Sequence, residues 1–197
     1  TAISLFTKQY IAKKMPGLEI LVINPGVDAD FFARADGSHY DTRPYQSYIL
    51  GVGQLRWRKG YHFSIRAFAK VRERFPDLHY VIVGSDDHGY ADRLTRLANE
   101  LTIADRVHIV GFQDPVQPFL AALDLYMHPA LMEGFGIAVV EAMAMGKAVG
   151  ATTTGGLPEV VAQGETGARA RAPSPRSRRR RAVPPRRCSR TRSGTRG

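Results

Sequence analysis

The sequence encodes a strand-to-helix turn at His128-Pro129-Ala130-Leu131-Met132-Glu133-Gly134-Phe135-Gly136-Ile137-Ala138-Val139-Val140-Glu141-Ala142-Met143. An apolar run at 123–127 precedes this stretch and predicts a buried strand, whereas its second half consists of helix-forming residues. Between them, Gly134 and Gly136 let the backbone approach a ligand without a Cβ atom in the way. The helix that opens near Ile137 would present unpaired N–H groups and a positive dipole end, which favour an anion.

Two carboxylates flank this turn, Glu133 before the predicted helix and Glu141 inside it. A carboxylate cannot bind a phosphate group, but it accepts hydrogen bonds from hydroxyl groups. A nucleotide-sugar requires N–H donors for its phosphate groups and carboxylate acceptors for its hydroxyl groups. The stretch therefore predicts a nucleotide-sugar site.

Apolar runs of strand length alternate with amphipathic helices along the middle of the chain. The predicted strands are 48–53, 78–83, 106–110, 123–127 and 148–151, and the helices are 61–75, 90–101, 115–120, 137–145 and 157–162. This alternation predicts an α/β fold with a doubly wound parallel sheet. Because parallel strands end at one edge, the loops that follow the strands should converge on one crevice. The strand ends are Gly53, Gly84, Gly111, His128 and Ala151.

The residues before this pattern are less regular. Helical spacing predicts a helix within 1–14, an apolar run predicts a short strand at 19–23, and the polar residues 30–45 are interpreted as a surface connection. Asp114, with Pro115 behind it, is the expected N-cap of the short helix that follows the third strand.

The last 30 residues, 168–197, contain 12 Arg and no acidic residue, and they show no apolar periodicity. They predict a disordered tail, which we interpret as a non-native reading frame or an engineered end in preference to a functional arm. The alternative is nucleic-acid binding through the tail. The rest of the chain has 16 basic and 18 acidic residues, so the net charge of +10 comes from the tail, and this distribution argues against a nucleic-acid partner.

The composition fits one domain with a sizeable core, since 44% of the 197 residues are apolar. The single cysteine, Cys188, excludes an intrachain disulfide. No apolar run approaches the roughly 18 residues that a membrane-spanning helix needs. We therefore expect a soluble, cytoplasmic protein.

Three motifs in this order resemble the C-terminal, donor-binding half of a GT-B fold glycosyltransferase. They are similar to the retaining enzymes of glycosyltransferase family 4, also described as glycosyl transferases group 1. Glu133 and Glu141, with seven residues between them, resemble the paired-glutamate motif of that family. The other motifs are Gly155-Gly156-Leu157-Pro158-Glu159, which resembles the loop that follows, and Asn24-Pro25-Gly26-Val27-Asp28, which resembles the segment leading into the domain.

The resemblance implies a role for each of these residues. Glu133 would accept hydrogen bonds from the donor sugar, Glu141 would accept them from the ribose, and Lys59 would neutralise the diphosphate. Lys59 and Glu133 are the predicted catalytic residues. The predicted donor-binding residues are Gly53, Gln54, Arg56, Lys59, Gly84, Gly111, Phe112, Glu133, Gly134, Phe135, Gly136, Ile137 and Glu141.

Several positions leave alternatives open. The family usually has arginine where this chain has Gln54; Arg56 or Arg58 could replace that contact or be solvated loop charges. Trp57 could line the crevice or cap the core. His128 is a candidate ligand contact, and the ring of Phe135 is expected to pack in the core. Asp86 and Asp87 are interpreted as helix-start charges, and we expect no metal site.

The resemblance implies a hexosyltransferase that retains the anomeric configuration, with a nucleotide-diphosphate sugar as donor and no cofactor. The acceptor would be a carbohydrate, a lipid or a small molecule, and the full enzyme could associate peripherally with a membrane. Residues 1–46 would link to an N-terminal domain that this truncated sequence lacks, 47–167 would bind the donor, and 168–197 would be the tail. The alternative is an inactive fragment that binds nucleotide-sugars.

Overall fold

The computed structural model describes residues 1–34, 45 and 47–172. In this part of the chain, six parallel strands form one sheet with the order β3-β2-β1-β4-β5-β6. The strands are β1 (Tyr48–Val52), β2 (His79–Val83), β3 (Val107–Gly111), β4 (Leu125–His128), β5 (Val149–Thr152) and β6 (Ala168–Ala170). The predicted doubly wound parallel sheet is confirmed, with the strand order of a dinucleotide-binding fold.

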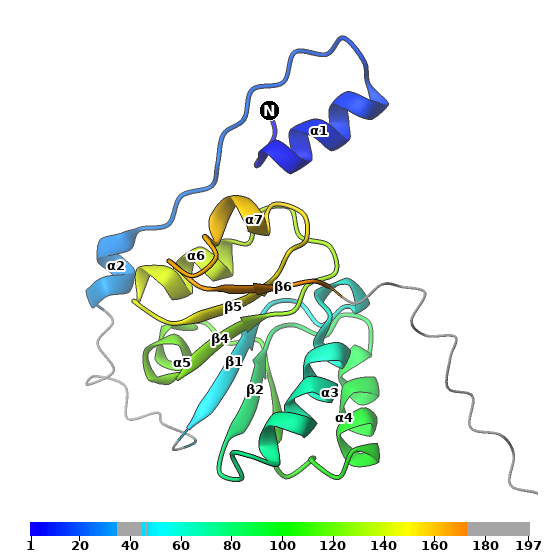
Figure 1. Cartoon of the computed structure of the whole chain (residues 1–197), viewed down its shortest axis with the longest axis vertical. Helices are drawn as coiled ribbons and strands as arrows, with labels where there is room; N and C mark the ends of the chain where they lie inside the picture. The colour runs from blue at the N-terminus through cyan, green and yellow to red at the C-terminus, as the bar shows by residue number, and fades with distance from the viewer. Residues whose placement is uncertain (35–44, 46, 173–197) are drawn as a thin grey trace, which may run out of the picture.

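Helices cover both faces of the sheet (Figure 1). One face carries α3 (Tyr61–Arg72) and α4 (Tyr90–Glu100), and the other carries α2 (Ala29–Arg34), α5 (Gln117–Ala122), α6 (Ile137–Ala144) and α7 (Leu157–Val160). A short 3-10 turn, η2 (Trp57–Lys59), precedes α3.

The two cores follow from the alternation of side chains along each strand. Ile49 of β1 and Ile82 of β2 pack with α3 and α4, whereas Leu50 and Val81 pack with α5 and α6. All four side chains are almost completely buried. Central strands buried on both faces require the continuous apolar runs seen in the sequence.

The direction of winding reverses between β1 and β4. After β1 the chain crosses to β2 on one side, and β4 occupies the other side of β1. In open α/β sheets, ligands bind at the carboxyl ends of the strands where the order reverses. The fold therefore places the candidate site between the loop after β1 and the loop after β4.

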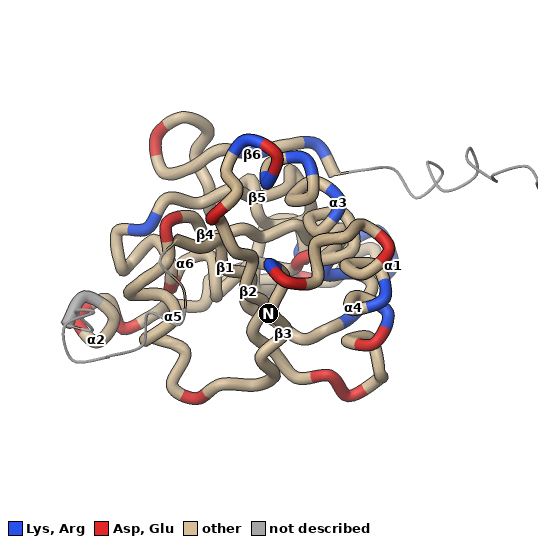
Figure 2. The backbone as a smooth tube through the Cα atoms, turned by 90° about the horizontal axis from the view of Figure 1, so that it is seen from below, with Lys and Arg blue, Asp and Glu red and all other residues tan. Residues whose placement is uncertain are grey.

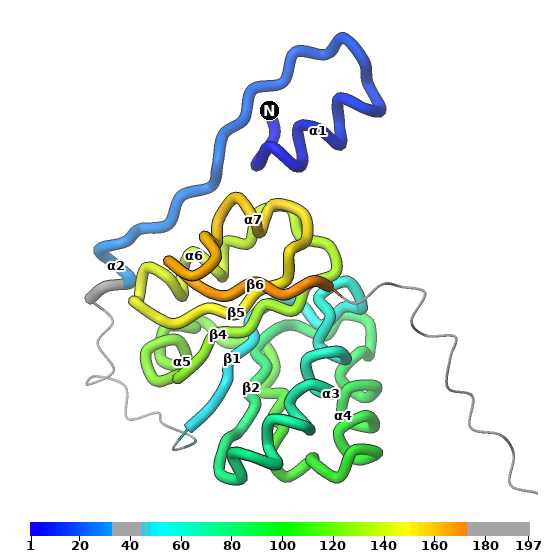
Figure 3. Tube along the Cα trace, viewed as in Figure 1, coloured from blue at the N-terminus to red at the C-terminus, as the bar shows by residue number. Residues whose placement is uncertain are grey.

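The N-terminal segment extends from this body (Figure 3). Its helix α1 (Leu5–Lys14) confirms the helix expected within 1–14. The carboxylate of Glu159, in α7, accepts hydrogen bonds from the backbone N–H groups of Leu5 and Phe6, each at 2.8 Å. The predicted strand at 19–23 is wrong, because Val22 forms only an isolated bridge with Ala2.

Three further expectations need correction. Residues 30–45 do not form only a surface connection, since Asp28 caps α2 through the N–H of Phe31 (2.9 Å) and Phe32 enters the core. The N-cap of α5 is Val116 and not Asp114. The predicted tail begins too early, because Ala168–Ala170 add β6 to the sheet beside β5. Residues 173–197 of the predicted disordered tail lie outside the described residues, as do residues 35–44 and 46 of the predicted linker 1–46.

Candidate functional site

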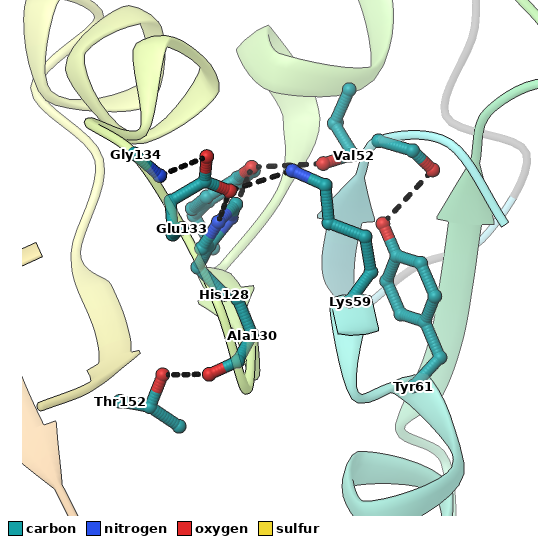
Figure 4. A network of polar contacts seen from close by, with 10 residues as sticks. Val52, Lys59, Tyr61, His128, Ala130, Glu133, Gly134 and Thr152 are labelled. Carbon is teal, nitrogen blue, oxygen red and sulfur yellow. Dashed lines mark hydrogen bonds and ion pairs between the residues drawn. The ribbon is translucent and has the colours of Figure 1, made fainter. Parts of the chain in front are cut away.

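Lys59 and Glu133 meet across the point where the strand order reverses (Figure 4). Lys59 ends the turn after β1, and Glu133 lies in the loop after β4. The Lys59 Nζ atom is 2.6 Å from Glu133 Oε2, and the side chains are only 14% and 12% exposed. The structure thus brings together the two predicted catalytic residues, which lie 74 positions apart in the chain.

Backbone contacts hold these two loops together. Gly60 has φ of 75°, and a Cβ atom there would overlap the carbonyl oxygen of Pro129. The N–H of Leu131 donates a hydrogen bond to the carbonyl oxygen of Arg58 at 2.7 Å. The close approach that Gly60 allows therefore fixes the loop of Lys59 against the loop of Glu133.

Glu133 has two further hydrogen-bond donors. His128 Nε2 lies 2.8 Å from Glu133 Oε2, and the Gly134 N–H donates to Oε1 at 3.1 Å. Burial by itself would raise the pKa of Glu133, but the hydrogen bonds from His128 and Lys59 outweigh it and lower the pKa to about 2. Glu133 is thus an ionised acceptor at neutral pH.

The structure places His128 beneath Glu133. This histidine ends β4 and is 3% exposed. Burial lowers its pKa, despite the nearby Glu133 carboxylate. Since a carboxylate can only accept, the proton of the neutral imidazole must lie on Nε2. The sequence identified His128 as a candidate ligand contact but gave no sign of this hydrogen bond.

The second glutamate lies apart from this network. Glu141 is half-buried in α6, and burial raises its pKa. Within the described residues, no side chain or backbone group forms a hydrogen bond with its carboxylate. Its charge contributes to raising the pKa of Tyr126 in β4, although burial of Tyr126 is the larger cause. Glu141 is therefore available to a ligand near the end of β4.

The glycines of both motifs pack against each other. Gly136 has φ of 101° and precedes α6, whose N-terminus has no side-chain cap. Gly155 has φ of 60°, and a Cβ atom on Gly155 or Gly156 would overlap the carbonyl oxygen of Glu133 or Gly134, respectively. The Gly156 N–H also donates to the Glu133 carbonyl oxygen at 3.0 Å. These glycines thus support the backbone that carries Glu133, a role that the sequence did not reveal.

The loop after β1 contains the other predicted contacts. The side-chain amide of Gln54 donates to the carboxylate of Asp87, which follows β2. Arg56 is half-buried and its Nε atom has no hydrogen-bond partner in the described structure. Trp57 is 37% exposed and stacks on the buried His62.

The remaining predicted residues have mixed positions. A Cβ atom on Gly84 would overlap the carbonyl oxygen of Gly53, so these two glycines pack the first two loops together. Phe112, after Gly111, is 71% exposed. Phe135 is 8% exposed and contributes its ring to the interior, as expected.

The adjacent acids Asp86 and Asp87 serve local structure. Asp86 accepts hydrogen bonds from the N–H groups of Tyr90 and Ala91 at 2.6 and 2.9 Å, which makes it a helix-start charge of α4 as expected. In the described part of the chain, no three His, Cys, Asp or Glu side chains form a metal-binding group.

This parallel sheet, with the strand order of a dinucleotide-binding fold and helices on both faces, belongs to the class of Rossmann-like domains found in GT-B enzymes. Residues 39–179 match the family described as "Glycosyl transferases group 1", and the chain belongs to this family. The expected group 1 glycosyltransferase family and the expected α/β fold are both confirmed.

Individual relatives agree with this assignment. The chain is 37% identical over 158 residues to D-inositol 3-phosphate glycosyltransferase of Mycolicibacterium smegmatis, a match that covers 75% of this chain and 35% of the relative. Anabaena HepE in complex with UDP-glucose is similar with a TM-score of 0.78 and 28% identity, over 87% of this chain and 49% of HepE. The C-terminal domain of LpcC from Francisella tularensis has a TM-score of 0.65 and 26% identity, over 77% of this chain and 83% of that domain. The chain thus spans about a third to a half of the full-length relatives.

Proposed function

We propose that this chain is the donor-binding part of a glycosyltransferase that moves a hexosyl group from a nucleotide-diphosphate sugar to an acceptor with retention. The observation that carries this proposal is the contact between Lys59 and Glu133 at the reversal of strand order. In this proposal Lys59 is the cation that binds the diphosphate, and the neighbouring ionised Glu133 is the acceptor for sugar hydroxyl groups. HepE, a solved structural neighbour, binds UDP-glucose, which supports this class of donor.

Each side chain has a defined task in this proposal. Lys59 stabilises the negative charge that develops on the departing diphosphate. Glu133 accepts hydrogen bonds from the transferred sugar, and Glu141 accepts them from the ribose. The uncapped N-terminus of α6 adds N–H donors and a positive dipole end to the same crevice. The acceptor attacks the anomeric carbon from the face that the nucleotide leaves, and no metal or cofactor takes part.

We expect the acceptor site to involve a part of the enzyme outside this match, because the match covers 35% of the D-inositol 3-phosphate glycosyltransferase and 49% of HepE. The acceptor is a carbohydrate, a lipid or a small molecule. The full enzyme works in the cytoplasm. Peripheral contact with a membrane would give it access to lipid acceptors. Within the described residues, no helix combines the length and apolar composition needed to cross a bilayer.

A nucleic-acid partner is disfavoured by the charge pattern. Figure 2 shows Lys and Arg lying among Asp and Glu along the described chain, without a continuous basic stripe. Nucleic-acid binding proteins gather basic residues on one face. Binding through the Arg-rich residues after 172 would appear as a salt-sensitive shift with RNA that is lost when residues 173–197 are deleted.

Calorimetry with UDP-glucose, GDP-mannose and ADP-glucose tests the proposed donor. We expect one nucleotide-sugar to bind and Lys59→Ala to weaken it by about tenfold or more, since a charged hydrogen bond contributes roughly 1.5–3 kcal/mol. Arg66→Ala removes the same charge from an exposed position of α3 and should leave the affinity unchanged. Equal effects of both substitutions would contradict the role of Lys59.

Glu141→Ala tests the ribose contact in the same assay. We expect an affinity loss of similar size, because a ribose hydroxyl would lose its ionised acceptor. Unchanged binding by this variant would refute the assignment of Glu141. Turnover of the donor separates the two forms of the proposal: an inactive fragment binds the donor without releasing the nucleotide, whereas a competent enzyme releases it.

A further inference from the structure

We propose that His128 is a positioning residue that holds Glu133 in place for the donor sugar when Lys59 turns from Glu133 to the donor diphosphate. This inference rests on the proposed function, because it concerns what happens to Glu133 once a nucleotide-sugar occupies the crevice. Its basis is the way in which the described side chains share the oxygen atoms of Glu133.

One carboxylate oxygen has two side-chain donors. Glu133 Oε2 accepts hydrogen bonds from Lys59 Nζ at 2.6 Å and His128 Nε2 at 2.8 Å, whereas Oε1 accepts, among the described residues, only from the Gly134 N–H at 3.1 Å. Figure 4 shows Lys59 approaching Glu133 from the turn after β1 and His128 approaching it from the end of β4. The second oxygen therefore retains room for a hydroxyl group of a ligand.

The two donors differ in their freedom to move. Lys59 reaches Glu133 on a four-carbon stem from a short loop, and its Cε and Nζ atoms lie beside Gly53 at the end of β1. His128 is inside the sheet, where it pairs with Ala151 of β5, and it is 3% exposed. Lys59 can therefore follow a phosphate by rotating its side chain, whereas His128 cannot leave without displacing β4.

A second buried group lies against the other ring nitrogen of His128. Tyr126 Oη lies 3.3 Å from His128 Nδ1, on the side of the ring opposite Glu133, and 3.4 Å from the carbonyl oxygen of Val52. The hydroxyl of the fully buried Tyr126 has a single proton, which is shared between the Val52 carbonyl oxygen and Nδ1. Because the ionised Glu133 can only accept, the imidazole proton lies on Nε2 and points at Glu133, and Tyr126 holds the opposite edge of the ring.

The hydrogen bond from His128 to Glu133 becomes important when Lys59 binds the diphosphate. Glu133 is 12% exposed, and a buried carboxylate without donors is strongly destabilised. The His128 and Gly134 N–H groups remain as its partners and keep it ionised and oriented. Without the His128 N–H, Glu133 would follow Lys59, rotate towards water or take up a proton, and each change weakens its contact with the sugar.

Comparing affinities for UDP and UDP-glucose tests this role, because Glu133 contacts only the sugar. We expect His128→Leu to reduce the affinity for UDP-glucose by about tenfold or more while leaving that for UDP within about twofold. His128→Gln should restore most of the loss, since its amide N–H can replace Nε2–H. A purely structural role would weaken UDP and UDP-glucose alike, and Gln would not rescue it.

Tyr126→Phe provides a second test if the substitutions at His128 prevent folding. It keeps the buried ring but removes the hydroxyl that contacts Nδ1 of His128, and we expect a selective loss of affinity for UDP-glucose. The inference is overturned if the ratio of UDP-glucose to UDP affinity stays at the wild-type value in His128→Leu, or in Tyr126→Phe where the former does not fold.

The proposed function can fail separately. A wild-type chain that binds neither UDP nor UDP-glucose, nor the other donors of the panel, refutes the proposed function and this inference with it. A wild-type chain that binds UDP but gains nothing from the glucose unit refutes the sugar contact of Glu133, and so again this inference. If the wild type binds UDP-glucose more tightly than UDP and His128→Leu keeps this difference in affinity, the proposed function stands and only the role of His128 is refuted.

Discussion

Gly155 lies directly against the backbone of Glu133, so closely that a Cβ atom at Gly155 would overlap the Glu133 carbonyl oxygen. Its φ of 60° also lies in the left-handed region. We expect Gly155→Ala to reduce the free energy of unfolding by about 3 kcal/mol, as the sum of backbone strain and overpacking. Urea unfolding measures this change.

Gly164→Ala is the matched control for that substitution. Gly164 has φ of 82°, but no atom lies within 4 Å of the Cβ position. Its substitution should cost only the strain of the left-handed backbone, about 1 kcal/mol. If both variants lose the same stability, the packing of Gly155 on Glu133 does not contribute.

Glu133 should contribute to the decrease in the free energy of unfolding at acid pH. Its pKa of about 2 in the folded chain is below the usual value, so its pairing stabilises the fold at pH above about 4.5 and is lost as pH falls towards 2. We expect this group to contribute about 3 kcal/mol across that window. Unfolding free energies of the wild type and Glu133→Gln at both ends of the window give the difference.

Glu165→Gln removes a carboxylate at an exposed position and serves as the control. It should follow the acid dependence of the wild type, whereas Glu133→Gln should show a smaller loss of stability on acidification. An identical loss in the wild type and Glu133→Gln would mean that the ion pair with Lys59 does not hold in solution.

The order of strands and helices could be predicted from sequence because each central strand has a recognisable apolar pattern. Ile49, Leu50, Val81 and Ile82 form continuous apolar runs, which a doubly covered sheet requires. The 168–170 segment gave no such signal, since its pairing with β5 uses backbone groups that any sequence has. Strand β6 was therefore missed.

In the site, too, the residues of one local motif could be predicted from the sequence, whereas most contacts between distant side chains could not. The motif around Glu133 identified the carboxylate and its glycines, because these residues are consecutive in sequence. Its pairing with Lys59 could be expected only from the convergence of parallel strand ends. The hydrogen bond from His128 and the turn of Gln54 towards Asp87 depend on side-chain directions, which no spacing in the sequence specifies.

The amino end of the sheet contains a histidine pair that should make stability fall below neutral pH. His79 Nδ1 lies 2.8 Å from His108 Nε2, and the ring of Tyr45 stacks on both imidazoles. Burial lowers the pKa of both histidines, with Arg106 adding to the effect. The neutral forms therefore stabilise the fold above about pH 6.5, and this contribution is lost as the pH falls through the lowered values.

His79→Phe keeps a ring for Tyr45 but removes one titrating group. Thermal unfolding between about pH 7.5 and 5 should show a shallower decrease for this variant than for the wild type. His88→Phe changes an exposed histidine in the loop after β2 and should keep the wild-type slope. Parallel curves for the wild type and His79→Phe would contradict the contribution of the pair.

The attachment of α1 should depend on Glu159. Its carboxylate accepts the N–H groups of Leu5 and Phe6, and the negative charge also suits the N-terminus of a helix. We expect Glu159→Ala to destabilise the attachment by about 1 kcal/mol and to speed hydrogen exchange in residues 1–14 while 48–160 stay protected. Uniform exchange changes in both regions would argue against a local role.

Gln54 offers a substitution that should strengthen donor binding. It lies after β1, next to Gly53, against which Lys59 packs, and its amide currently contacts Asp87. Gln54→Arg would place a second cation near the diphosphate, and we expect about three- to tenfold tighter binding of UDP, in line with a gain of roughly 1 kcal/mol for a partly exposed charge. Asp87 competes for the new guanidinium, so Gln54→Arg combined with Asp87→Asn should bind UDP more tightly than Gln54→Arg alone.

Calorimetry on both variants at low and high salt measures the effect, and the gain in affinity should shrink as salt screens the added charge. Gln54→Met, which adds no charge, is the control; equal affinities for the Arg and Met variants would place Gln54 outside the diphosphate site.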